Sequence, residues 1–150
     1  MTAGEFCVRE VDLVQPDETA WQAAVRMRQR VVGSLVALDD ARQPIGIITD
    51  RDLMERVLAA GKDPSVTLAR DVMTPRPTTI AEEQSVWRAL ELMREGRFRR
   101  LPVVDQNGAL AGLLTLDDVL MLLAEGMAHI GETVRRETPQ GVAEELAASR

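Results

Sequence analysis

The chain has 150 residues, of which 45% are hydrophobic, and it carries a formal net charge of −6. This acidity disfavours a nucleic-acid or anionic-membrane partner, because both of those surfaces are themselves negative. The single cysteine, Cys7, excludes a disulfide or a cysteine metal cluster within one chain. No apolar run approaches the ~18 residues that a membrane helix needs, and no apolar signal segment opens the chain, so we expect a cytoplasmic protein.

The sequence repeats itself at a lag of 66 positions, which aligns residues 12–58 with 78–124 without a gap. Identical residues recur along the alignment, namely Trp21 and Trp87, Ala23 and Ala89, Met27 and Met93, Arg28 and Arg94, Leu35 and Leu101, and Asp39 and Asp105. So long a lag indicates duplication of a small α/β unit. Because about 60 residues bury only a marginal core, we expect the two copies to pack face to face.

The first copy predicts the element order β-α-β-β-α. Residues 11–14 form a short extended piece, and the polar stretch that ends at Thr19 is suited to begin a helix. Apolar residues spaced by three, four and seven positions behind it define one buried helical face. Apolar runs at 35–38 and 44–48 follow as strands, and a second helix opens near Asp50.

The second copy predicts the same order after a linker at residues 63–77. Its elements are an extended piece at 78–80, a helix after Ser85, strands at 101–104 and 110–114, and a helix that opens near Leu116. We therefore predict an α/β (α+β) fold of two repeats, at 8–62 and 78–125, packed with pseudo-twofold symmetry. Residues 126–150 are predicted as a tail that holds at most a short amphipathic helix at 142–147.

Both copies carry the motif G-h-h-T-x-x-D between a strand and a helix, running from Gly46 to Asp52 and from Gly112 to Asp118. The strand before the second motif reads R-R-L-P-V-V-D at 99–105, and the linker contains D-V-M-T-P at 71–75. Together these motifs resemble the CBS domain, the cystathionine-β-synthase repeat, over about residues 8 to 125. The resemblance implies a regulatory pair of repeats (a Bateman module) that usually dimerises into a disc and commonly takes AMP, ADP, ATP or S-adenosylmethionine in its clefts.

The acids of these motifs suit recognition of a nucleoside. Asp52 and Asp118, one turn into a helix, can each accept hydrogen bonds from both hydroxyls of a ribose. Thr49 and Thr115 add a hydroxyl three residues earlier, and Arg99 and Arg100 are the candidate cations for a phosphate. The remaining candidates for the nucleotide site are two glycines, which allow the backbone to approach a ligand closely, and residues that would line the adenine pocket. They are Gly46 and Gly112, and Ile47, Ile48, Leu113, Leu114, Pro102, Val14, Thr79 and Ile80.

Several of these features have a second interpretation. Thr-x-x-Asp at a helix start is also a capping box, in which Thr caps the helix and the acid reaches back. The basic run that includes Arg94 and Arg97 is either a phosphate clamp or a solvated face. Arg51 points into a cleft or across a dimer interface, and we favour the interface.

The two predicted sites differ in charge. Where the second copy has Arg99 and Arg100, the first has Gly33 and Ser34. In the family, phosphate contacts often come from the repeat opposite the ribose acid. By that pattern we expect a charged nucleotide beside Asp52, and an adenosine-like ligand or none beside Asp118.

The sequence therefore predicts a homodimeric regulatory module that senses an adenine nucleotide and acts on a separate partner by a shift between conformations. It predicts no cofactor and no metal. A ligand-free dimerisation or scaffolding module is the alternative. We do not expect an enzyme, since no Ser-His-Asp set, Cys-His pair or phosphate-binding loop occurs and His129 is the only histidine.

Overall fold

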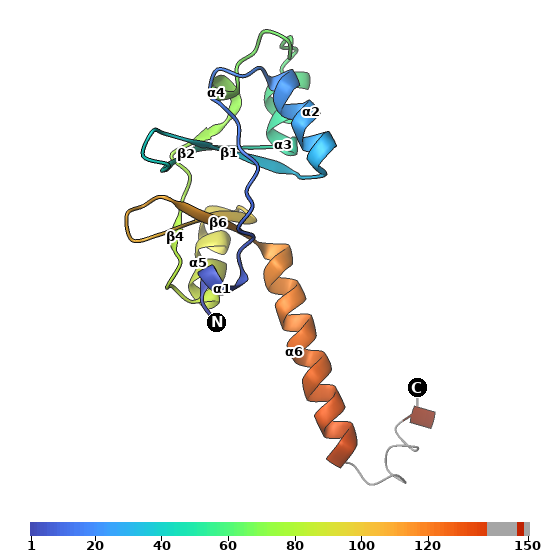
Figure 1. Ribbon diagram of the computed structural model, residues 1–150. Coiled ribbons are helices and arrows are strands. Elements are labelled where there is room, and N and C mark those ends of the chain that lie inside the picture. Colours follow the sequence, from blue (N-terminus) through green and yellow to red (C-terminus); the bar gives the residue numbers. More distant parts are fainter. Residues whose placement is uncertain (138–146, 149–150) are drawn as a thin grey trace. The chain divides into compact units, whose positions relative to one another are not determined.

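The structure is a computed structural model that describes residues 1–137 and 147–148 (Figure 1). It divides into one unit at Met1–Leu116, which holds both β-sheets, and a second at Asp117–Arg150, which holds most of the last helix. Among the described residues, no helix is both long and apolar enough to traverse a membrane.

Short strands alternate with helices along the chain. In order, the elements are α1 (Ala3–Phe6), α2 (Ala20–Arg30), β1 (Ser34–Leu38), β2 (Pro44–Thr49), α3 (Asp50–Leu53), η1 (Met54–Leu58), α4 (Ala69–Val72), β3 (Thr74–Pro75), β4 (Ile80–Ala81), α5 (Val86–Gly96), β5 (Arg100–Val104), β6 (Leu110–Thr115) and α6 (Leu116–Glu137). The segment η1 is a π-helical turn that continues α3 directly.

Two three-stranded sheets confirm the mixed α/β fold that the sequence predicted. The first has the order β1-β2-β3 with antiparallel neighbours, and the second has the order β4-β5-β6 with β4 parallel to β5. Leu35 lies opposite Ile48 in the first sheet, as Leu101 lies opposite Leu114 in the second. The hairpins therefore pair in the same register, as duplication requires. In Figure 1 helices α2, α3 and α4 lie with the first sheet, and α5 and α1 lie with the second.

The two repeats exchange their leading segments. Strand β3, which comes just before the second repeat, adds to the first sheet with Thr74 opposite Ile47. Val8, which comes before the first repeat, exchanges two backbone hydrogen bonds of 2.9 Å with Leu113 of the second sheet. Each sheet is thus completed by chain that precedes the other repeat.

Helices α1 and α4 extend this exchange, since they occupy equivalent positions at the lag of 66. The amide of Ala3 in α1 donates to Gln84 O of the second repeat at 2.7 Å. The amide of Ala69 in α4 donates to Glu18 O of the first repeat at 2.8 Å, and Ala69 is fully buried in the core of that repeat. The structural repeat therefore begins near residues 2 and 68, earlier than the sequence alignment indicated.

Capping residues fix where the two long helices of the first unit begin. The Thr19 hydroxyl accepts from the Gln22 amide at 3.2 Å, and the Gln22 side chain accepts from the Thr19 amide at 2.8 Å, which forms a capping box at α2. The Ser85 hydroxyl accepts from the Arg88 amide at 3.2 Å at the start of α5. Both helices were predicted to begin at these residues.

Helix α6 is longer than the sequence pattern indicated. It continues to Glu137, whereas the second repeat was predicted to end near residue 125. Apolar side chains at Leu120, Leu123, Met127, Ile130 and Val134 keep a regular helical spacing past that boundary, which is the physical reason for the extension. The short helix predicted at 142–147 falls almost wholly outside the described residues.

Candidate functional site

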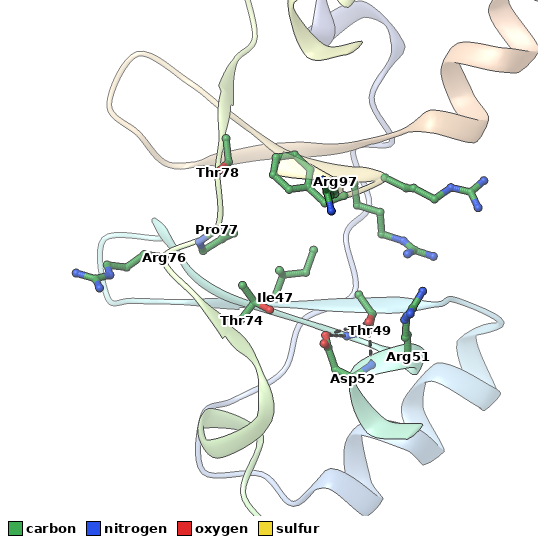
Figure 2. A pocket seen from close by; sticks show the side chains of 12 residues that line it. Ile47, Thr49, Arg51, Asp52, Thr74, Arg76, Pro77, Thr78 and Arg97 are labelled. Atoms are coloured by element: carbon green, nitrogen blue, oxygen red, sulfur yellow. Dashed lines mark hydrogen bonds between the residues drawn. The ribbon is translucent and has the colours of Figure 1, made fainter. Parts of the chain in front are cut away.

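A cleft of about 370 Å³ lies between the two repeats, within the first unit. Its lining comes from three stretches of chain, namely Ile47, Thr49, Arg51 and Asp52 of the first repeat, Thr74, Arg76, Pro77 and Thr78 where the linker meets the second repeat, and Arg97, Phe98, Arg99 and Arg100 farther along the second repeat. Figure 2 shows Ile47, Thr49 and Asp52 on the side of β2 and α3, with Arg97 across from them. The cleft is therefore acidic and hydroxylic on one wall and cationic on the other.

Thr49 and Asp52 form a reciprocal capping box at the start of α3. The Thr49 hydroxyl accepts from the Asp52 amide at 3.1 Å, while Asp52 Oδ2 accepts from the Thr49 amide at 2.8 Å and from the Thr49 hydroxyl at 2.9 Å. The capping interpretation of Thr-x-x-Asp is thus confirmed at this helix. The same two side chains line the cleft, so capping does not remove them from a binding surface (Figure 2).

The second oxygen of Asp52 is held by an arginine on the next helical turn. Arg56 Nη2 lies 3.2 Å from Asp52 Oδ1, and the Asp52 side chain is only 12% exposed. A carboxylate has about four acceptor positions, of which three are used here. Asp52 therefore offers one open acceptor position, and a second only where one of its present donors moves away.

Arginines gather on the opposite wall. Arg97, Arg99 and Arg100 come from the end of α5 and the start of β5, while Arg51 adds a fourth guanidinium from α3, on the same wall as Asp52 (Figure 2). Arg51 pairs with Glu55 at 2.7 Å with its side chain 77% exposed. Arg51 lines the cleft, which was one of the two roles considered from the sequence, and the dimer-interface role that we favoured stays a prediction. Guanidinium groups at this density suit a phosphate or another multivalent anion.

Arg97 has an unusual backbone for its residue type. It ends α5 in the left-handed conformation, with φ of 56°, and its amide donates to Met93 O. Arg76, also on the cleft, has φ of 47°. Val31, equivalent to Arg97 at the lag of 66, ends α2 in the same conformation, so at Arg97 this conformation belongs to the helix end of the repeat. In Figure 2 the Arg76 side chain extends away from Thr49 and Asp52, so Arg97 is the better placed of the two.

Five of the residues predicted for a nucleotide site line this cleft: Ile47, Thr49, Asp52, Arg99 and Arg100. Others lie elsewhere because neighbouring residues on a strand point to opposite faces. Ile48 is fully buried in the core, as are Val14, Ile80 and Pro102, and none of these four lines the cleft. Thr78, and not Thr79, lines the cleft.

The two motif glycines accommodate the protein's own side chains. A Cβ at Gly46 would collide with the thioether of Met73, and one at Gly112 would collide with the Cys7 thiol and come within 2.8 Å of Val8 O. Met73 and Cys7 are themselves equivalent at the lag of 66. The close approach predicted at these glycines therefore involves the exchanged segments, and neither glycine is among the residues that line the cleft.

The corresponding residues of the second repeat are placed differently. Leu114 is fully buried, and Leu113 pairs with Val8. Thr115 ends β6, while Asp118 lies past the boundary at Leu116, in the unit that α6 forms. The structure thus describes an assembled cleft for Asp52, and the asymmetry between the two predicted sites stays a prediction.

Sequence reasoning did not assign Thr74, Arg76, Pro77, Thr78 and Phe98 to the cleft. Three of these five, Thr74, Arg76 and Pro77, belong to the linker, whose motif indicated only a connection between the repeats. Arg97 had been considered as part of a basic run, and its position two residues before Arg99 on the predicted loop was the available signal. Arg56 was also missed, although its spacing of four residues after Asp52 on a helix predicts contact.

The fold and the cleft define a module of two duplicated α/β units with one cleft between them. The family model for the CBS domain matches residues 3–59 and 69–125, so the chain belongs to the CBS domain family. These limits agree with the structural repeats that start near residues 2 and 68. They also confirm the resemblance on which the sequence prediction rested.

Curated relatives with this likeness include uncharacterized proteins. One from Methanopyrus kandleri is 39% identical over 136 residues, which cover 91% of this chain and 69% of that protein. YlbB of Bacillus subtilis is 38% identical over 103 residues, which cover 68% of each chain. The CBS domain-containing protein CBSCBSPB3 of Arabidopsis thaliana is 35% identical over 113 residues, but this chain spans only 20% of its length.

Solved structures with the same fold include two that hold a bound ligand or metal. CBSX2 in complex with AMP has a TM-score of 0.70 and 27% identity, with 83% of this chain and 96% of that one covered. Hypoxic Response Protein I with two coordinated zinc ions has a TM-score of 0.72 and 30% identity, with 81% and 98% covered. Within residues 1–137 and 147–148, no group of three or more His, Cys, Asp or Glu is arranged to hold a metal ion.

Proposed function

We propose that this protein is a regulatory module that binds an adenine nucleotide in the cleft between its two repeats. Stand-alone pairs of CBS domains are generally regulatory and not catalytic, which supports this proposal. Binding would favour one arrangement of the repeats, and a separate partner in the cytoplasm would respond to that arrangement. AMP, ADP and ATP are the preferred candidates, and S-adenosylmethionine is a weaker one.

The observation that carries this proposal is the distribution of charge across the cleft. Asp52 and Thr49 on one wall suit the hydroxyls of a ribose, and the arginines on the other wall suit a phosphate. Ile47 and Phe98 add apolar surface against which a base can lie. The AMP complex of CBSX2, a structural relative, supports a nucleotide of this class.

The direct test is thermal unfolding and calorimetric titration with AMP, ADP, ATP and S-adenosylmethionine. A ligand that binds only the folded state raises the free energy of unfolding by about 2.7 kcal/mol at a hundredfold excess over Kd. Asp52→Asn should weaken binding at least tenfold, while Asp118→Asn, the equivalent change in the second repeat, should leave this site intact. Because Asp52 also caps α3, both variants are first checked for cooperative unfolding. No binding of any of these compounds at millimolar concentration refutes the proposal.

A second candidate function, a dimerisation module, is supported by α6. Its apolar residues follow spacings of 3, 4, 3 and 4 and are largely exposed, with relative exposures of 53% at Leu120, 39% at Leu123, 69% at Met127, 60% at Ile130 and 56% at Val134. This is the seven-residue pattern of a coiled coil. Uncharged residues flank it (Ala124, Gly126, Gly131 and Thr133), so no like charges would oppose pairing with an identical helix.

We therefore propose that the chain forms a homodimer through α6 of a second copy, whether or not a nucleotide is bound. Light scattering coupled to size-exclusion chromatography tests this with Met127→Glu, which places a charge in the centre of the stripe. Ala128→Glu, on the next residue and off the stripe, is the matched control. Met127→Glu should yield a monomer under conditions where Ala128→Glu stays dimeric, and a monomeric unmodified protein would refute this proposal.

A further inference from the structure

Arg56 joins the candidate ribose acid to the linker between the repeats. Its Nη2 lies 3.2 Å from Asp52 Oδ1 and also donates to Thr74 Oγ1 at 3.2 Å, while its Nη1 donates to Val72 O at 2.7 Å. One guanidinium therefore contacts α3, the end of α4 and β3 at once. Arg56 itself is not among the residues that line the cleft.

The backbone around Arg56 is suited to this reach. Arg56 lies in the π-helical turn η1, where the Ala59 amide donates to Met54 O at 2.9 Å, five residues back. Such turns are rare, contain one residue more than an α-helical turn, and occur frequently at functional sites. The turn follows the capping box of Asp52 directly, so a movement of either element is transmitted to the other over a few residues.

The linker is equally tied to the cleft. Thr74 and three residues after it line the cleft, and Met73 fills the space above Gly46 on β2. Val72 is buried in the core of the first repeat. When the Arg56 side chain releases Val72 O and Thr74 Oγ1, it therefore loosens the segment that connects the two repeats.

The second repeat lacks this arrangement. Leu122 occupies the position equivalent to Arg56 at the lag of 66, and Val8 occupies the position equivalent to Thr74. Neither side chain can form an ion pair or a hydrogen bond. The arginine tie is therefore a property of the first repeat alone, where the cleft is assembled.

We propose that Arg56 is a positioning residue that competes with the ribose diol for Asp52 and reports occupancy of the cleft to the linker. This inference rests on the proposed nucleotide site. Asp52 Oδ2 already accepts two hydrogen bonds from Thr49, so Oδ1 is the oxygen that remains for a diol. A diol that takes both acceptor positions of Oδ1 displaces Arg56, which then releases Val72 and Thr74.

The test compares Arg56→Met with the unmodified protein in calorimetric titrations of AMP and of 2′,3′-dideoxy-AMP. Removing a partly exposed competitor ion pair should tighten AMP binding about twofold to fivefold. The dideoxy compound has no diol and should gain nothing. Arg88→Met is the matched control, because it removes an ion pair of 2.9 Å with Glu91 on α5, outside the cleft.

Hydrogen exchange at the Met73 amide gives an independent measurement. This amide donates to Ala69 O at 2.8 Å, and Met73 is not a cleft residue, so a ligand does not shield it directly. AMP should accelerate its exchange in the unmodified protein. In Arg56→Met, exchange should already be fast without ligand and should change little when AMP is added.

The outcomes separate this inference from the proposed function. Equal or weaker AMP binding by a cooperatively folded Arg56→Met overturns it, as does an equal gain for the dideoxy compound. AMP binding that leaves Met73 exchange unchanged in the unmodified protein also overturns it, while the nucleotide site stands. Failure of the unmodified protein to bind AMP, ADP or ATP refutes the nucleotide site and this inference together.

Discussion

Replacing Gly112 with alanine should destabilise the protein more than replacing Gly46, although the two glycines are equivalent in the repeat. A Cβ at Gly112 would lie 2.8 Å from the backbone oxygen of Val8. That oxygen accepts a hydrogen bond of 2.9 Å from the Leu113 amide and is held in the sheet. At Gly46 the atoms in the way belong to the Met73 side chain, whose three rotatable bonds let it move.

The expected loss of free energy of unfolding depends on whether a side chain or the backbone has to move to make room for the added Cβ. At Gly46 a side chain of three rotatable bonds adjusts, and we expect a loss of about 1 kcal/mol in the free energy of unfolding. At Gly112 the backbone of Val8 must shift and its ladder hydrogen bond is strained, so overpacking and a lost hydrogen bond add to about 3 kcal/mol. For a chain of this size each 1 kcal/mol lowers Tm by about 2–4 °C.

Urea denaturation followed by circular dichroism measures both losses, with Tm as a second readout. Cys7→Ala in the background of Gly112→Ala provides a further check, because it removes the thiol and leaves the Val8 carbonyl in place. It should therefore recover only part of the lost stability. Equal losses at the two glycines, or full recovery by Cys7→Ala, would refute the assignment of the larger cost to the exchanged backbone.

Three further predictions concern stability. Val31→Gly should raise the free energy of unfolding by about 1 kcal/mol, because Val31 has φ of 57°, which strains a residue with a Cβ, and is 89% exposed. A lower free energy of unfolding would show that the Val31 side chain makes a needed contact. Hydrogen bonding to Arg26 lowers the pKa of Glu18, so the contribution of this group to stability is present above about pH 4.5 and is lost as pH falls through the lowered pKa. Glu18→Gln should therefore cost about 1 kcal/mol at pH 7 and progressively less as pH falls below 4.5, and a pH-independent cost would contradict this. Ser85→Ala should cost about 1 kcal/mol through loss of the α5 cap, whereas Ser85→Thr should cost less than half of that.

Much of the fold was predictable because it depends on local pattern. Helices α2 and α5 are capped by Thr19 and Ser85 as predicted, and both hairpins lie where the apolar runs indicated. The exchange of leading segments was not predictable, because it depends on contacts between residues such as Ala3 and Gln84 that lie far apart in the chain. The helices of these segments, α1 and α4, have four residues each and little sequence in common, so the repeat at a lag of 66 is not evident there.

The site was predictable where a motif fixed both residue type and spacing. Thr49 and Asp52 were identified in this way, with their capping role and their place on the cleft as parallel interpretations. Apolar walls were harder to assign, because strand alternation sends Ile47 to the cleft and Ile48 to the core. The linker residues could not be assigned, since their position depends on how the two sheets are joined.

The exchanged segments have a consequence for how such a chain could have arisen and how it can be divided. A single ancestral repeat, expressed alone, would present an unsatisfied strand edge at Leu113 or Ile47 and would hold a leading segment that fits only another copy. Two such chains would therefore complete each other by swapping, and gene fusion would then make the swap intramolecular. A chain cut in the loop at residues 61–63 should accordingly reassemble from its two fragments, and neither fragment should be stable without the other.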